Sequence, residues 1–99
     1  MRVIGVDPGT FNMGIGVVDS DSDGLGLVYS TVLRPSKPAL LSQRLQYLYD
    51  QMERLVGEWA PSEVAIEEPF VARNVRAAMA VGQAQAVAMV AAASHDLPV

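Results

Sequence analysis

Short apolar runs separated by turn-forming residues open the chain. The first run covers residues 3–7 and ends on an aspartate, directly before a Pro-Gly pair that stops a strand and turns the chain. A second apolar run covers residues 13–19, and beyond the polar stretch DSDSDG a third run, residues 25–33, alternates between apolar and polar positions. This pattern predicts three strands joined as an antiparallel meander.

The apolar spacing changes after the breaker-rich loop at residues 34–38. Apolar residues then recur every three or four positions, which is typical of an amphipathic helix, and Gly57 and Pro61 mark the decay of the pattern. The apolar stripe consists of Leu41, Leu45, Leu48, Met52 and Leu55. A further apolar run, EVAIE at residues 63–67, predicts a fourth strand that Pro69 ends.

The last long element is a run of small apolar residues. Asn74 is a suitable cap for a helix that continues to about His95. The run is short for a bilayer and contains Gln83 and Gln85, so we expect a buried helix of a soluble protein and no contact with a membrane. Because this helix is apolar nearly all round, it needs partners on more than one side. Residues 97–99 resemble the beginning of another strand.

The predicted order of elements is therefore β-β-β-α-β-α within a single α/β domain, residues 1–99. The first helix is long enough to serve as a crossover, so the fourth strand can lie parallel to the first. The strand begun at residues 97–99 is cut short, and we expect the domain to be truncated at its C-terminal side.

Composition narrows the classes of function. Hydrophobic residues make up 51% of the 99 residues, which indicates a packed core. The absence of cysteine excludes a disulfide framework and a cysteine-based zinc site. A formal charge of −4 argues against a generally basic nucleic-acid-binding face, although a local basic patch can still bind phosphate. The N-terminus carries no secretion signal, so we expect a cytoplasmic protein.

Two of the predicted strands end on a carboxylate, at Asp7 and at the pair Glu67 and Glu68. If these strands are parallel neighbours, the acids lie at the same C-terminal edge of the sheet, where α/β folds place their sites. Two close carboxylates repel each other, so either one is protonated or a cation lies between them, and oxygen-only ligands favour Mg²⁺ or Mn²⁺. The two glutamates point to opposite faces, and spacing alone does not decide between them. A single acid at a strand end is more commonly a turn former or helix cap.

Three segments together resemble the RuvC family of Holliday-junction resolvases. They are RVIGVDPG at the N-terminus, VAIEEPFVARN at residues 64–74 and AMAVGQAQAVAMVAAA at residues 78–93, and they occur in the family's order. The resemblance implies an RNase H-like fold and a DNA endonuclease that nicks two opposing strands of a four-way junction. It also implies Mg²⁺ as the cofactor, with Mn²⁺ able to substitute, and two-metal phosphodiester hydrolysis.

The resemblance further assigns roles to individual residues. Asp7 and Glu67 align with the first two catalytic, metal-binding acids of the family. The residues expected to contact DNA are Phe70, Arg73, Asn74 and Arg76. The residues expected to form the dimer interface are Ala78, Gly82, Gln85, Ala86 and Met89. The implied partners are four-way junction DNA, a second copy of the chain and a branch-migration motor complex.

The chain departs from the family pattern in its acids. The family uses four, and the last two lie on a later helix, beyond the segment that matches residues 97–99. We interpret Asp19, Asp21 and Asp23 as solvated turn residues. We therefore expect this chain to be the N-terminal part of a resolvase rather than an active nuclease by itself.

Three alternatives stay open at this point. The stretch GVDPGT also resembles the first phosphate-binding motif of the actin, sugar-kinase and heat-shock-protein ATPases, in which a hydroxyl such as that of Thr10 would contact nucleotide phosphates. A RuvC-like family typed by DVGTKRIG is closer, but DPGTFNMG lacks its basic residues. A chain with half of the acids could also be a non-catalytic junction-binding or assembly module.

Overall fold

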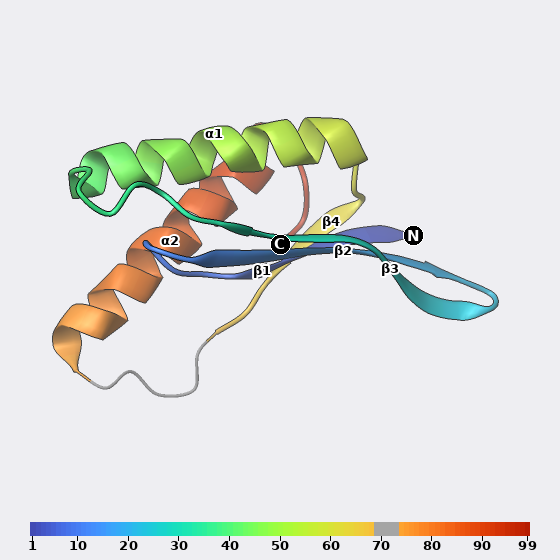
Figure 1. The fold of residues 1–99 in the computed structure, drawn as a ribbon. Coiled ribbons are helices and arrows are strands. Elements are labelled where there is room, and N and C mark those ends of the chain that lie inside the picture. The colour runs from blue at the N-terminus through green and yellow to red at the C-terminus, as the bar shows by residue number, and fades with distance from the viewer. Residues whose placement is uncertain (69–73) are drawn as a thin grey trace.

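The computed structural model describes residues 1–68 and 74–99 of the chain. The elements follow the predicted order, and Figure 1 shows their arrangement. They are β1 (Arg2–Asp7), β2 (Met13–Asp21), β3 (Gly24–Leu33), α1 (Leu41–Trp59), β4 (Glu63–Ile66) and α2 (Val75–Ser94).

One four-stranded sheet organises the fold, with the strand order β3-β2-β1-β4. The first three strands pair antiparallel as the predicted meander, and β4 returns through the α1 crossover to lie parallel to β1. The core lies between the sheet and the two helices, and in it Ile4 of β1 and Val17 of β2 are fully buried against α1 residues such as Leu48. The predicted α/β topology is confirmed.

The tight connection between β1 and β2 depends on glycine at position 9. A Cβ atom built on Gly9 would lie 2.2 Å from the backbone oxygen of Asn12, far inside any normal contact distance. The Pro8-Gly9 pair therefore does more than end β1, because the glycine lets the returning backbone pass directly beside it.

The helix α1 begins with a capping arrangement and ends in a left-handed residue. The side chain of Gln43 accepts a hydrogen bond of 2.9 Å from the backbone N–H of Leu40. At the other end Ala60 has φ 47°, and its N–H donates to the carbonyl of Val56. The helix ends at Trp59, between Gly57 and Pro61, the two residues predicted to mark its decay.

The helix α2 is covered on one side only. Asn74 caps it as predicted, and its side chain accepts a 2.9 Å hydrogen bond from the N–H of Ala77. The residues buried against the rest of the chain are Ala84, Ala88, Ala91 and Ala92. Met79 and Val90 are 59% and 57% exposed. The expectation of a buried helix is therefore wrong for most of its circumference, since no described element covers the other sides.

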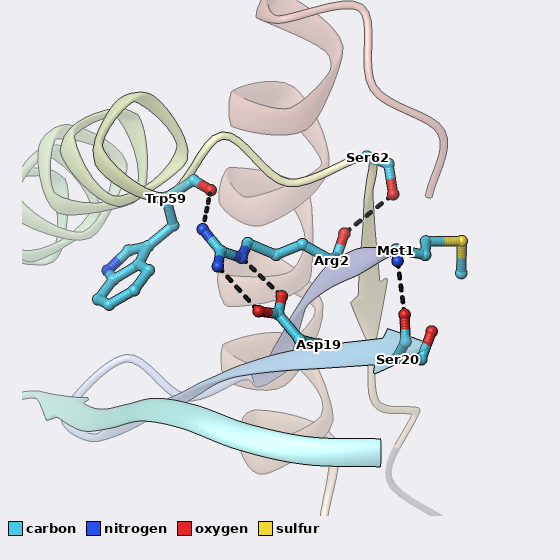
Figure 2. Close-up of polar contacts among 6 residues, drawn as sticks. All are labelled: Met1, Arg2, Asp19, Ser20, Trp59 and Ser62. Carbon is cyan, nitrogen blue, oxygen red and sulfur yellow. Dashed lines mark hydrogen bonds and ion pairs between the residues drawn. The ribbon is translucent and has the colours of Figure 1, made fainter. Parts of the chain in front are cut away.

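A polar cluster stabilises the sheet at the N-terminal end of β1 (Figure 2). Arg2 binds Asp19 with two hydrogen bonds of 2.7 and 2.8 Å, and it donates a third, of 3.1 Å, to the carbonyl of Trp59. The ammonium group of Met1 donates to the carbonyl of Ser20 on the neighbouring strand. The interpretation of Asp19 as a solvated turn residue is therefore wrong, because β2 extends past it and Arg2 lies directly across from it.

The last residues of the chain run along the free edge of β4. The N–H of Val64 donates to the carbonyl of Pro98 at 3.0 Å. Just before this point, the side chains of Ser94 and His95 contact the carboxylate of Glu53 on α1, at 2.6 and 2.9 Å. Residues 97–99 thus lie where the predicted further strand would pair, although they are not themselves a strand.

Candidate active site at the C-terminal edge of β1 and β4

The parallel pairing of β1 with β4 brings two acids to the same edge of the sheet. Val6 pairs with Ile66, and the ladder continues one step, since the N–H of Glu67 donates to the carbonyl of Val6 at 2.8 Å. Asp7 and Glu67 therefore lie at the ends of two neighbouring strands, at the same edge of the sheet. Both line one open cavity of about 420 Å³.

The same geometry separates the two consecutive glutamates. Glu68 does not line the cavity of Asp7, and lies instead in a cavity with Ile66, Gln85 and Met89. The alternation of side chains along an extended strand accounts for this difference. Glu67 is thus the glutamate that shares a cavity with Asp7, a choice that spacing alone left open.

Small residues give the two acids room. The rest of the cavity lining includes Gly5, Gly14, Gly16 and Ala65. A Cβ atom on Gly14 would lie 3.4 Å from the Cβ of Asp7 and 3.9 Å from its Oδ2, so a side chain here would occupy the space beside the carboxylate. The sequence interpretation missed these glycines. The sequence does contain a signal for them: glycine alternates in GIG at residues 14–16, and Gly16 pairs with Gly5 of VIGVD on the neighbouring strand.

The arrangement fits a hard divalent cation. Two carboxylates that are both solvent-exposed and lie in one cavity offer only oxygen ligands, which Mg²⁺ and Mn²⁺ prefer. Within residues 1–68 and 74–99, no group of three or more acidic, histidine or cysteine side chains surrounds a common point. The described part of the chain therefore brings two carboxylates, Asp7 and Glu67, to this cavity.

Helix α2 contacts the backbone of Glu67 at this edge of the sheet. The side-chain amide of Gln85 donates a 3.2 Å hydrogen bond to the carbonyl of Glu67. Gln85 is half-buried, whereas the other residues predicted for a dimer interface are exposed. These exposed residues are Ala78, Gly82, Ala86 and Met89. Gln85 thus has a partner within its own chain, next to the candidate site.

The residues predicted to contact DNA divide into two groups. Phe70 and Arg73 lie outside the described residues. Asn74 caps α2, and Arg76 is exposed in the first turn of the same helix. Thr10, which the ATPase alternative would require at the phosphates, is only 5% exposed and lines a groove on the helix side of the sheet.

The segments that match known proteins cover nearly the whole chain. The family described as crossover junction endodeoxyribonuclease RuvC matches residues 3–99. A protein of that name from Dehalococcoides mccartyi is 44% identical over 99 residues, which are 100% of this chain and 59% of the relative. Another from Roseiflexus sp. is 41% identical over 98 residues, 99% of this chain and 58% of the relative. The chain thus spans about three-fifths of the length of the curated relatives it matches.

Solved structures give the same result. The structure of T. thermophilus RuvC in complex with Holliday junction substrate superposes with a TM-score of 0.92 at 30% identity, over 100% of this chain and 61% of that one. The yeast mitochondrial Holliday junction resolvase Ydc2 matches with a TM-score of 0.69 over 95% of this chain and 44% of its own, and at 12% identity it supports the fold alone. The fold is therefore RNase H-like, and the chain belongs to the RuvC family.

Proposed function

We propose that this chain is part of a Holliday-junction resolvase and supplies the first two metal-binding acids, Asp7 and Glu67, of a DNA endonuclease. The observation that carries the proposal is the parallel register of β1 and β4, which brings both acids into one cavity. Membership in the RuvC family and the likeness to a RuvC structure that holds junction DNA support it.

In this proposal the protein residues hold and orient rather than react. Asp7 and Glu67 bind Mg²⁺, with Mn²⁺ as a substitute, and the remaining ligands come from a part of the protein that this chain does not cover. Gly14 leaves the Asp7 carboxylate open on one side. Gln85 fixes the backbone of Glu67. Bound divalent ions supply the activation of water and the stabilisation of the leaving oxygen in phosphodiester hydrolysis.

The substrate and partners follow from the same family membership. The whole protein acts on four-way junction DNA as a homodimer, and the exposed side of α2 with Gly82, Ala86 and Met89 is the surface proposed for the second copy. Small residues on this side allow a second helix to approach closely. A branch-migration motor complex is a further expected partner, on the family resemblance alone.

The test compares three single replacements in the complete natural protein. Asp7→Asn and Glu67→Gln remove a metal-binding charge, and we expect each to slow junction nicking in Mg²⁺ by about 100-fold or more. Glu68→Gln is the matched control, because Glu68 lies in a different cavity. Junction binding is measured separately without Mg²⁺, and we expect it to persist in all three variants.

The alternative of a non-catalytic junction-binding module makes the opposite prediction. The observation in its favour is that the described residues provide two acids and no larger group of metal ligands. In that case the wild-type protein binds junctions without nicking them, and Asp7→Asn changes neither property. Nicking that survives Asp7→Asn unchanged would overturn the assignment of this acid.

A further inference from the structure

A groove on the helix side of the sheet lies close to the candidate active site and is not used by it. It has a volume of about 530 Å³ and forms where the β1–β2 connection meets the first turns of both helices. Phe11, which contributes to its wall, lies four residues after Asp7, so their Cα atoms are at most about 14 Å apart. The residues lining the groove are Thr10, Phe11, Leu41, Arg44, Val75, Arg76, Met79, Ala80 and Gln83.

The groove contains a preassembled aromatic and cationic pair. The guanidinium carbon of Arg44 lies 4.2 Å from the centre of the Phe11 ring, well within the range of a cation–π contact. The same guanidinium donates a 2.9 Å hydrogen bond from Nη1 to the carbonyl of Ala39, which holds it in place. Its Nε is buried and has no hydrogen-bond partner among the described residues.

The Phe11 side chain touches the groove and remains 44% exposed. Arg44 lies over one face of the ring, and the residue keeps this 44% exposure to solvent with Arg44 in place. An exposed aromatic ring that is already held in position loses little conformational freedom when a flat ligand stacks on it.

The charges around the groove favour an anionic ligand. The chain as a whole has a net charge of −4, yet the described residues that line the groove include two arginines and no acid. Arg76 is exposed and forms no ion pair with any residue in the described part of the chain. Leu41, Val75 and Met79 contribute apolar side chains to the same lining. A flat ring next to a negative group satisfies all of these features.

We propose that this groove binds one unpaired nucleotide of a DNA strand, with its base stacked on Phe11 and its phosphate at Arg76. The inference rests on the proposed function, since it assigns a second DNA contact to the same enzyme. Inside a continuous duplex both faces of a base are covered by its neighbours, so a base that stacks on Phe11 has lost a stacking neighbour on at least one side.

The main experiment places a fluorescent adenine analogue at successive positions around the crossover of a four-way junction and titrates each DNA with the complete protein. The titrations are carried out without Mg²⁺. We expect one position to change its emission on binding to the wild-type protein. Phe11→Ala should abolish that change and weaken junction binding by about 5- to 150-fold. Phe11→Trp should restore both, because tryptophan also offers a flat ring.

Phe11→Leu separates stacking from simple packing. Leucine keeps an apolar side chain but has no flat ring, so under the proposal it behaves like Phe11→Ala. If Phe11 only fills space against Arg44, Phe11→Leu behaves like the wild type, and the proposal is wrong. Because Phe11 is partly exposed, all three variants should fold, which unfolding in denaturant without DNA verifies.

Arg76 provides an independent measurement. Arg76→Gln should reduce the slope of the logarithm of junction affinity against the logarithm of salt concentration by about one, as expected for a lost phosphate contact. Arg54→Gln is the control, since Arg54 is paired with Gln51 and Glu58 on α1 and lines no part of the groove. An equal slope for Arg76→Gln and the wild type would overturn the phosphate assignment.

The outcomes distinguish this inference from the proposed function. If the wild-type protein nicks junctions and Asp7→Asn does not, while every Phe11 variant binds normally, the groove proposal fails and the resolvase stands. If the wild-type protein neither binds nor nicks junctions, the proposed function itself fails. If Phe11→Ala instead changes the oligomeric state without DNA, the groove is occupied by protein and the proposal is overturned.

Discussion

The replacement of Gly9 by alanine tests how the β1–β2 connection fixes the position of Asp7. A Cβ atom at this position would lie 2.2 Å from the carbonyl oxygen of Asn12. Close carbon–oxygen contacts in proteins are about 3.3–3.6 Å, so the connection must open by about 1 Å. The obstructing atom belongs to the backbone and cannot rotate away.

The expected size of the effect follows from this displacement. Forcing a group into a space that is already filled costs about 1–3 kcal/mol, so Gly9→Ala should lower the free energy of unfolding by that amount. Asp7 lies two residues before Gly9 and moves with the connection. A shift of about 1 Å in a catalytic group can cost about 100-fold in rate, so junction nicking should slow by a comparable factor.

Two assays and one control make the prediction specific. Unfolding in denaturant measures the loss of stability, with the slope m unchanged, and nicking in Mg²⁺ measures the displacement of the site. Gly57→Ala is the control, because no atom of the described residues lies within 4 Å of a Cβ atom built there, on the exposed surface of α1. This control should gain up to about 1 kcal/mol from helix propensity and nick normally. The reasoning is refuted if Gly9→Ala unfolds and nicks like the wild type.

Three further predictions concern the core and the helix ends. Leu48 is fully buried, so Leu48→Ala should lower the free energy of unfolding by about 2–5 kcal/mol, whereas Leu25→Ala, at an 81% exposed position, should change it by less than about 0.5 kcal/mol. Asn74→Ala removes the cap of α2 and should cost about 0.5–2 kcal/mol, while Asn74→Asp keeps a capping oxygen; equal unfolding midpoints for the two variants would contradict this role. The hydroxyl of Ser94 is the main cause that lowers the pKa of Glu53 from its ordinary value of 4.5, so Ser94→Ala should raise that pKa. Stability from a lowered carboxyl pKa is present above pH 4.5 and is lost as the pH falls through the pKa of the folded state. The difference in the free energy of unfolding between wild type and Ser94→Ala should therefore narrow in acid. Unfolding measured across a pH series would disprove this if the difference stayed constant.

Local patterns were sufficient to predict the strands and the two helices. The apolar runs that end on Asp7 and Glu67 predict strand ends, and the crossover helix between them predicts parallel pairing, which the register of β1 and β4 confirms. The choice between Glu67 and Glu68 could not be made in this way. It depends on how the strand is turned relative to its neighbours, which is a property of the whole sheet.

The predictions that failed depended on contacts between distant residues. Asp19 stands in a stretch with the composition of a turn, but its partner Arg2 is 17 residues away in the sequence. The side of α2 that packs could not be read from its composition either. Apolar residues surround this helix nearly completely, so no polar face indicates which side is exposed.

The pairing of Arg2 with Asp19 has a consequence for the far end of β1. The same ladder that joins Arg2 to Asp19 joins Asp7 to Gly14, five positions along one short strand. A slip of β1 by a single residue would turn Asp7 to the helix side of the sheet and close the cavity that it shares with Glu67. Arg2 donates two hydrogen bonds to Asp19 and a third to the carbonyl of Trp59, and these bonds oppose such a slip. The position of the Asp7 carboxylate at the C-terminal end of β1 thus depends on contacts made at the N-terminal end of the same strand.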